Sequence, residues 1–252
     1  IETAVNIGYS CALLTNEMIQ ATVDGNSTNT VKYQLQEALA TFRLETAKYA
    51  LIISGDALLR IAKPELIRLF LKCVDYAEVV LACRVSPQQK AQLVKLIKDT
   101  KPDVRTLSVG DGANDVNMIL AAHVGVGIAG VEGKQAVRAA DYSIAQFSYL
   151  KRLLFVHGRE CYRKNTNLIC YNFYKNVLLV MPLFFYGLFS AYSGQILYNM
   201  WTYQLFNVFY AASPIIIYAI FDKDLDYENL ETKPSSYKLG LIGDLFSTKV
   251  FW

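Results

Sequence analysis

The sequence predicts two parts, an α/β domain built on a parallel sheet and an α-helical hairpin that crosses a membrane. Short apolar runs alternate with amphipathic stretches between about Tyr49 and Ile144, a pattern typical of strand–helix–strand units. No Asp, Glu, Lys, Arg or His occurs in the 46 residues from Asn176 to Phe221. The chain is 53% hydrophobic and 19% charged, against roughly 45–50% and about 25% in an average globular chain. It is therefore too apolar to be wholly soluble or disordered.

The predicted strands are short apolar runs, each bounded by glycine or polar residues. They span residues 51–53, 79–81, 106–109 and 124–126. One helix is expected over 64–74, because proline suits the first turn of a helix. Another opens at Ser86, whose partner Gln89 stands at the spacing of a capping box, and a third spans 116–122. Parallel sheets of this kind bind ligands at the carboxyl ends of their strands.

The amino-terminal residues give weaker signals. Residues 23–34 read as a polar loop and residues 31–49 as an ordinary surface helix. The first residue is not Met and no basic leader precedes the domain, so we expect the chain to be a segment of a longer protein.

Charge and cysteine content exclude several classes of protein. The formal net charge of +3 is too small to indicate a nucleic-acid binder. The five cysteines are scattered, with no C-x-x-C pair. This excludes a disulfide scaffold or a zinc module and indicates a reducing compartment.

The main candidate site is the hexapeptide from Gly110 to Asp115, which joins a predicted strand to a predicted helix. Asp111 and Asp115 place two carboxylates at the carboxyl end of the strand. Mg²⁺ prefers one or two carboxylates together with phosphate oxygens and water, and a helix N-terminus at the same point favours an anion. The alternative is structural, because Asp and Asn are also common turn formers and N-caps.

Two cations accompany this hexapeptide. Lys90 opens the helix after the second predicted strand, and Arg84 stands just past the end of that strand. In a parallel sheet both can point at the phosphate site, where a fixed positive charge stabilises a transferring phosphoryl group. Alone, each would be read as a solvated surface charge.

A glycine pattern at Gly125–Gly130 satisfies the dinucleotide fingerprint G-x-G-x-x-G. The acidic residue expected about 20 positions later is missing. We therefore interpret these glycines as positions of tight packing beside the metal site.

Three motifs together resemble the phosphorylation domain of P-type ATPases, a haloacid-dehalogenase-type, Rossmann-like fold. They are Ala82-Cys-Arg-Val-Ser-Pro-Gln-Gln-Lys90, Ser108-Val-Gly-Asp-Gly-Ala-Asn-Asp-Val116 and Gly125-Val-Gly-Ile-Ala-Gly-Val-Glu-Gly133. Further segments resemble the type IV branch, the phospholipid flippases. They are Glu2–Cys11, Gln146–Lys151, Val156-His-Gly158 and Phe173-Tyr-Lys-Asn176.

The resemblance implies a site and a reaction. It implies Mg²⁺ at Asp111 and Asp115, and nucleotide or phosphate contacts from Arg84, Lys90, Asn114 and Asp115, with Lys90 as the catalytic cation. It also implies ATP as cofactor, an aspartyl-phosphate intermediate and a phospholipid substrate. An accessory glycoprotein subunit is expected only on this ground.

The family's nucleophile motif Asp-Lys-Thr-Gly-Thr and its dephosphorylating loop are not found in the sequence, and Ser54-Gly55 departs from the family's Asp-Gly. By this comparison residues 1–150 are the carboxy-terminal part of a phosphorylation domain and 151–167 a stalk helix. Residues 168–221 are two membrane helices, the fifth and sixth, and 222–252 lead to a further membrane helix. We expect the isolated chain to hydrolyse no ATP.

The uncharged run is long enough for two membrane helices of about 20 residues each. A turn at Ser193-Gly194-Gln195 fits between them. Basic residues precede the run, at 151, 152, 159, 163 and 164, so the positive-inside rule places residues 1–167 and 222–252 in the cytosol. The alternative is a hairpin buried in a soluble core, although such cores rarely run so long without a charge.

The composition of the hairpin bears on its cargo. Neither Asp nor Glu occurs from Cys161 to Phe221, so a cation lacks its usual ligands there. Lys175 is the one cation within the apolar run that begins near Leu168, and either it snorkels to the cytosolic boundary or it serves a function. The resemblance places Lys175, Asn176 and Asn207 along the route of a lipid headgroup.

Two other functions remain open on sequence grounds. A membrane-anchored phosphatase would share the phosphate chemistry but needs an Asp-x-Asp nucleophile, which residues 1–60 do not contain. A catalytically dead membrane adaptor would lack a nucleophile in the full gene as well. Pro182 and Pro214 are expected to break or kink their helices in any of these cases.

Overall fold

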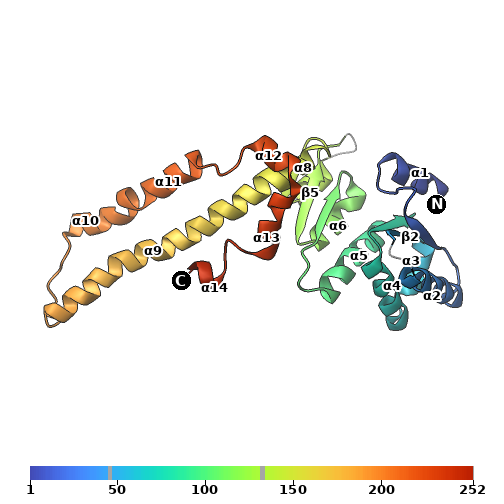
Figure 1. Cartoon of the computed structure of the whole chain (residues 1–252), viewed down its shortest axis with the longest axis horizontal. Helices are drawn as coiled ribbons and strands as arrows, with labels where there is room; N and C mark the ends of the chain where they lie inside the picture. The colour runs from blue at the N-terminus through green and yellow to red at the C-terminus, as the bar shows by residue number, and fades with distance from the viewer. Residues whose placement is uncertain (45–46, 131–133, 252) are drawn as a thin grey trace. The chain divides into compact units, whose positions relative to one another are not determined.

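A computed structural model describes residues 1–44, 47–130 and 134–251 of the chain. They form two compact units, Ile1–Gln146 and Phe147–Trp252, which are described separately (Figure 1). Residues 131–133, the end of the third motif, lie outside the described residues.

The first unit contains parallel strands in two sheets of three. One sheet has the order β1 (Ile19–Val23), β2 (Tyr49–Ser54), β3 (Val79–Cys83), and the other the order β4 (Leu107–Gly110), β5 (Val124–Ile128), β6 (Tyr142–Ile144). The four predicted strands and their parallel direction are confirmed. The expectation of a single sheet is not met, because no backbone pairing joins β3 to β4 among the described residues.

Helices connect these strands. They are α1 (Glu2–Ser10), α2 (Thr28–Leu44), α3 (Gly55–Ile61), α4 (Pro64–Tyr76), α5 (Pro87–Thr100), the 3-10 turn η1 (Ala113–Asp115), α6 (Val116–Ala121) and α7 (Gln135–Ala139). The capping box of α5 is present as predicted. Ser86 Oγ accepts from Gln89 N at 3.3 Å, and Gln89 Oε1 accepts from Ser86 N at 2.7 Å.

The predictions for residues 23–49 were right about a helix but wrong about where it begins and how far it is buried. Strand β1 ends at Val23 and α2 begins at Thr28, within the expected polar loop. Nor is α2 an ordinary surface helix, because Val31, Leu35 and Phe42 are buried in the main core beside β2 and α4. The polar residues around Thr28 concealed the first turn of this helix, whose buried apolar positions recur every three to four residues.

One hydrogen-bonded histidine lies between β4 and β5. Thr106 N donates to His123 Nδ1 at 3.1 Å, so this nitrogen must be unprotonated. Partial burial and the charges of Lys98 and Arg105 lower the pKa of His123 below its ordinary value of 6.5. The folded state disfavours the protonated ring. The contribution of neutral His123 to the stability of the fold is therefore fully present above pH 6.5, and it is lost as the pH falls from 6.5 towards the lower pKa of the folded state.

We therefore expect thermal unfolding of the purified chain to shift to lower temperature as pH falls below about 6.5. A His123→Asn variant, which cannot take up the proton, is expected to lose that part of the pH dependence. An identical pH dependence in the variant would contradict the assignment.

The second unit is mostly helical. It contains α8 (Tyr149–Arg152), the π-helical turn η2 (Leu153–Gly158), α9 (Arg159–Phe189), α10 (Met200–Leu205), the π-helical turn η3 (Phe206–Tyr210), α11 (Ala212–Phe221), α12 (Tyr227–Thr232), the 3-10 turn η4 (Pro234–Tyr237), α13 (Lys238–Ile242) and α14 (Thr248–Phe251). Two continuous helical stretches, Tyr149–Phe189 and Met200–Phe221, are long and apolar enough to cross a membrane. The predicted turn at 193–195 lies between them.

The two prolines of the hairpin differ in effect. Helix α9 continues through Pro182. Pro214 follows η3, where Ala211 N donates to Phe206 O, five residues back, at 2.8 Å. Proline has no N–H to donate to residue 210, and the π-helical turn η3 ends at that residue.

Candidate phosphate and metal site

The site is built where β4 ends and α5 begins. Lys90 Nζ donates to Asp115 Oδ1 at 2.8 Å. The Asp115 side chain is 13% exposed and that of Lys90 33%. The structure thus brings together the cation and one of the two carboxylates that the sequence predicted to share a site.

The tight turn after β4 explains the position of Asp115. A Cβ added to Gly110 would lie 2.3 Å from Asp115 Cβ, far inside van der Waals contact. Only glycine at position 110 therefore lets the Asp115 side chain fold back over the end of the strand.

Asp111 supplies the second carboxylate. It is exposed, and its side chain makes no hydrogen bond or ion pair in the part of the chain that the structure describes. A Cβ on Gly130, just after β5, would lie 3.5 Å from Asp111 Cβ, so the ends of β4 and β5 meet at this side chain. Asn114 is also exposed, within η1.

These residues fit a magnesium ion that takes only one or two ligands from the protein. Within the described ranges, no three His, Cys, Asp or Glu side chains are grouped closely enough to form a metal cage. Mg²⁺ needs no such cage, because one or two carboxylates suffice when phosphate oxygens and water complete its shell. Asp111 and Asp115 are the residues that would hold it.

Arg84 lies at the end of β3 in the left-handed region, with φ of 55°. Its carbonyl oxygen would lie 2.3 Å from a Cβ on Gly55, so a glycine at 55 is required. The Arg84 side chain is exposed and makes no hydrogen bond or ion pair among the described residues. The structure does not join it to Lys90 and Asp115.

Two neighbours of Arg84 have structural roles. Gln89 Nε2 donates to Gly55 O at 2.6 Å, which ties the first turn of α5, and so Lys90, to the end of β2. Ser54 is the N-cap of α3 and accepts from Ala57 N at 3.3 Å. Capping thus accounts for Ser54, whose role the sequence left open.

The glycine pattern after β4 is a packing feature. A Cβ on Gly127 would lie 2.6 Å from Val137 Cα, and one on Gly125 would lie 2.5 Å from Ile119 Cγ2. Helices α6 and α7 can approach β5 this closely only because both positions lack side chains.

Replacing Gly127 with Ala is expected to destabilise β5 and α7 by about 1–3 kcal/mol, because the new methyl group meets backbone that must shift. Hydrogen exchange of the amides in these two elements measures the effect. Gly130→Ala is the matched control, since its Cβ would meet nothing closer than 3.5 Å. Equal exchange in both variants would contradict this interpretation.

The three residues expected along the lipid route of the hairpin make no polar contact with one another. Lys175 is half-buried on α9 and Asn176 beside it is exposed. Asn207 is exposed within η3. None of the three makes a side-chain hydrogen bond or ion pair among the residues described by the structure.

Comparison with known proteins shows which proteins this chain is similar to. A family model described as the C-terminal part of phospholipid-translocating P-type ATPases matches residues 137–252. Phospholipid-transporting ATPase C887.12 of Schizosaccharomyces pombe is 42% identical over 257 residues, covering 100% of this chain and 20% of the relative. Phospholipid-transporting ATPase DRS2 of Saccharomyces cerevisiae is 42% identical over 257 residues, with 100% and 19% covered. The probable phospholipid-transporting ATPase IM of Homo sapiens is 39% identical over 279 residues, with 100% and 23% covered.

The chain belongs to the phospholipid-transporting P-type ATPases. It spans about a fifth of the length of these curated relatives. Its α/β unit with parallel strands and its two long apolar helices agree with the fold class predicted from sequence. Membership of this family and the two candidate spans indicate an integral membrane protein.

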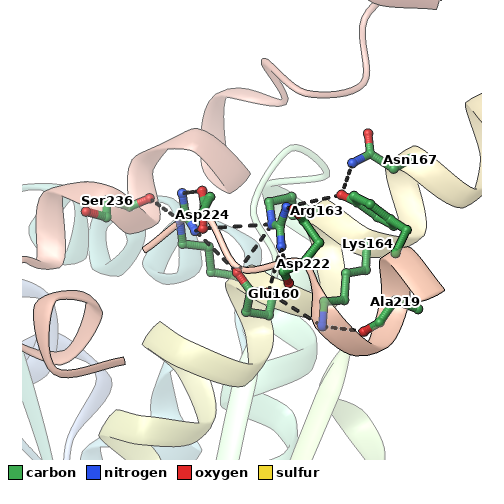
Figure 2. Close-up of polar contacts among 10 residues, drawn as sticks. Glu160, Arg163, Lys164, Asn167, Ala219, Asp222, Asp224 and Ser236 are labelled. Carbon is green, nitrogen blue, oxygen red and sulfur yellow. Dashed lines mark hydrogen bonds and ion pairs between the residues drawn. The ribbon is translucent and has the colours of Figure 1, made fainter. Parts of the chain in front are cut away.

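A second polar cluster in this phospholipid-transporting ATPase segment was not predicted (Figure 2). From the sequence, the basic residues 151–164 were expected to orient the hairpin and to lie in a stalk helix, with no partners assigned to them. Two of them, Arg159 and Arg163, are 7% and 9% exposed, and both contact Glu160 and the acidic residues after α11. The available signal was the pair Asp222 and Asp224, the first charges after the uncharged run.

Proposed function

We propose that this chain is the part of an ATP-driven phospholipid flippase that holds its magnesium-binding carboxylates and two of its membrane helices. The observation that carries the proposal is the Lys90–Asp115 pair, at 2.8 Å, with the exposed Asp111 carboxylate at the same strand end. A bound Mg²⁺ would neutralise charge on phosphoryl oxygens there. The names of the relatives support phospholipid as the substrate.

The residues of the site divide the work. Asp111 and Asp115 would hold Mg²⁺, while Lys90 offsets negative charge on the phosphoryl group and also orients Asp115 through their hydrogen bond. Arg84 and Asn114, both exposed near strand ends, are free to contact nucleotide or phosphate. The phosphorylated aspartate itself is expected from a part of the full protein that carries the motif missing here.

The hairpin supports a lipid rather than a cation as cargo. No carboxylate occurs between Cys161 and Phe221, so the ligands that replace the hydration shell of a cation are missing. Lys175, Asn176 and Asn207 supply uncharged amides and one positive charge, which suit a phosphate-bearing headgroup. An accessory glycoprotein subunit belongs to the same proposal.

The test uses the full-length protein that contains this segment, reconstituted in phospholipid vesicles. We expect phosphate from labelled ATP to be incorporated only with Mg²⁺, phospholipid to accelerate its release, and a fluorescent phospholipid to change leaflets with ATP. The isolated 252-residue chain is expected to turn over no ATP. Phosphate incorporation without any response to phospholipid would reject lipid as the cargo. ATP turnover by the isolated chain would contradict the expectation that the nucleophilic aspartate lies in another part of the full protein.

A further inference from the structure

Four polar side chains on α9 follow one another at intervals of four residues. They are Arg159, Arg163, Asn167 and Tyr171, which we call the polar ridge. Residues four apart form a continuous ridge on a helix surface, the kind that packs against a neighbouring helix. Each member of the polar ridge contacts α11 or a residue on one side of it.

The first member fixes the chain that follows α11. Arg159 Nη1 and Nη2 donate to the two carboxylate oxygens of Asp224 at 2.9 and 2.7 Å, and Nε donates to Ser236 O at 3.3 Å. The Arg159 side chain is only 6% exposed. Its hydrogen bonds are the chief reason that the pKa of Asp224 lies below the ordinary value.

The second member caps the end of α11, as Figure 2 shows. Arg163 donates to the Asp222 carboxylate, to Asp222 O at 3.2 Å and to Tyr218 Oη at 3.1 Å. The adjacent Lys164 donates to Ala219 O at 2.8 Å. Carbonyls of the last helical turn lack partners within the helix and attract cations, so α9 supplies what the end of α11 needs.

The remaining members extend these contacts along the hairpin. Asn167 Nδ2 donates to Tyr218 Oη, and Tyr171 Oη donates to Ala211 O, next to η3, at 2.9 Å. Glu160 balances the charge of the ridge through ion pairs with Arg159 and Arg163 at 3.6 and 3.0 Å. Large apolar side chains on both helices, such as Val177 and Ile217, are each 57% exposed. Apolar packing between the helices is therefore sparse, and the polar contacts fix their relation.

We propose that Arg159, Glu160 and Arg163 are positioning residues that make the two membrane helices move as one body. A displacement of α9 then carries α11, and with it η3 and Asn207, instead of bending the hairpin. The link to lipid movement rests on the proposed function, whereas the mechanical claim about the two helices does not. The contact between the two helices should be disrupted by single substitutions, because removing one partner of a buried ion pair leaves the other charge buried without compensation.

The mechanical claim is tested by electron paramagnetic resonance in the full-length protein, reconstituted in phospholipid vesicles. Spin labels at positions 177 and 217 report the distance between α9 and α11. We expect Arg159→Gln to widen the distance distribution about twofold or more, and Asp224→Asn to act similarly because it breaks the same bidentate contact. The double variant is expected to be no wider than either single one, since paired residues act as a unit.

A matched control is available in the same part of the chain. Arg152 pairs with Glu231 at 3.7 Å, but the two side chains are 56% and 32% exposed, and exposed pairs contribute little. Arg152→Gln should leave the distance distribution unchanged. If Arg159→Gln does not fold, Arg159→Lys replaces it, because it keeps the charge and loses the bidentate geometry. An unchanged distribution in the Arg159 and Asp224 variants would overturn the proposal.

The functional link is tested in the same preparations. We expect phosphate incorporation from ATP to stay within about twofold of wild type, and phospholipid-stimulated release to fall about tenfold or more in Arg159→Gln. An equal loss of both steps would reject a positioning role in transport. If the wild-type protein incorporates no phosphate, only the proposed function is rejected. The distance measurement would still decide whether α9 and α11 move together.

Discussion

Asp115→Asn in the full-length protein is expected to reduce Mg²⁺-dependent phosphate incorporation from ATP by about 100-fold or more, equivalent to roughly 2.7 kcal/mol of activation free energy. The amide keeps the shape of the side chain and still accepts a hydrogen bond from Lys90, but it removes a negative charge from the proposed magnesium site. Quantifying labelled phosphoenzyme in a magnesium titration tests this. The loss should appear as a weaker apparent affinity for Mg²⁺ as well as a lower rate.

The fold should survive the same substitution. The hydrogen bond from Lys90 remains, and the Lys90 side chain is 33% exposed, so removing the charge of Asp115 is expected to cost only about 1 kcal/mol of stability. Asp103→Asn, which neutralises an exposed carboxylate in the loop before β4, is the matched control and should leave phosphate incorporation unchanged. Undiminished incorporation in Asp115→Asn would refute the assignment of this carboxylate to the metal.

Local sequence signals predicted the frame of this site well. The capping box at Ser86 and Gln89 fixes where α5 begins, and that start determines where Lys90 stands. The hexapeptide after β4 likewise carries its own turn geometry, through Gly110. Both depend on residues a few positions apart, which a single sequence reveals directly.

Features that depend on distant residues were not predicted. Strand β1 was not predicted. A helix was predicted over residues 31–49, but its burial was missed, because the elements that cover the apolar face of α2, β2 and α4, are distant from it in sequence. The polar ridge was missed for the same reason. Arg159 and Asp224 are 65 residues apart in sequence. The predicted hairpin returns the end of α11 to the side of the membrane where α9 starts, but the sequence does not show which side chains meet there.

Lys175→Ala is expected to separate the two halves of the transport cycle. The side chain lies about seven residues into the apolar run, roughly 10 Å along the helix at 1.5 Å per residue. A cation held at membrane depth costs about 3 kcal/mol, and Lys175 has no hydrogen bond or ion pair among the described residues to offset that cost. If a phospholipid headgroup supplies the missing partner, its removal should weaken lipid-stimulated turnover about tenfold while phosphate incorporation changes less than about threefold.

Two further variants decide between a headgroup contact and snorkelling. Lys175→Arg keeps the positive charge and should retain most of the lipid response, because a phosphate can be bound by either cation. Lys151→Ala removes an exposed cation of α8 and should change neither step. If Lys175 instead snorkels to the membrane boundary, Lys175→Ala should leave lipid-stimulated release unchanged, because the side chain then makes no contact with the headgroup. Equal loss of phosphorylation and lipid response in Lys175→Ala would instead mean that this residue supports the fold of α9, because a headgroup contact acts only on the steps that involve lipid.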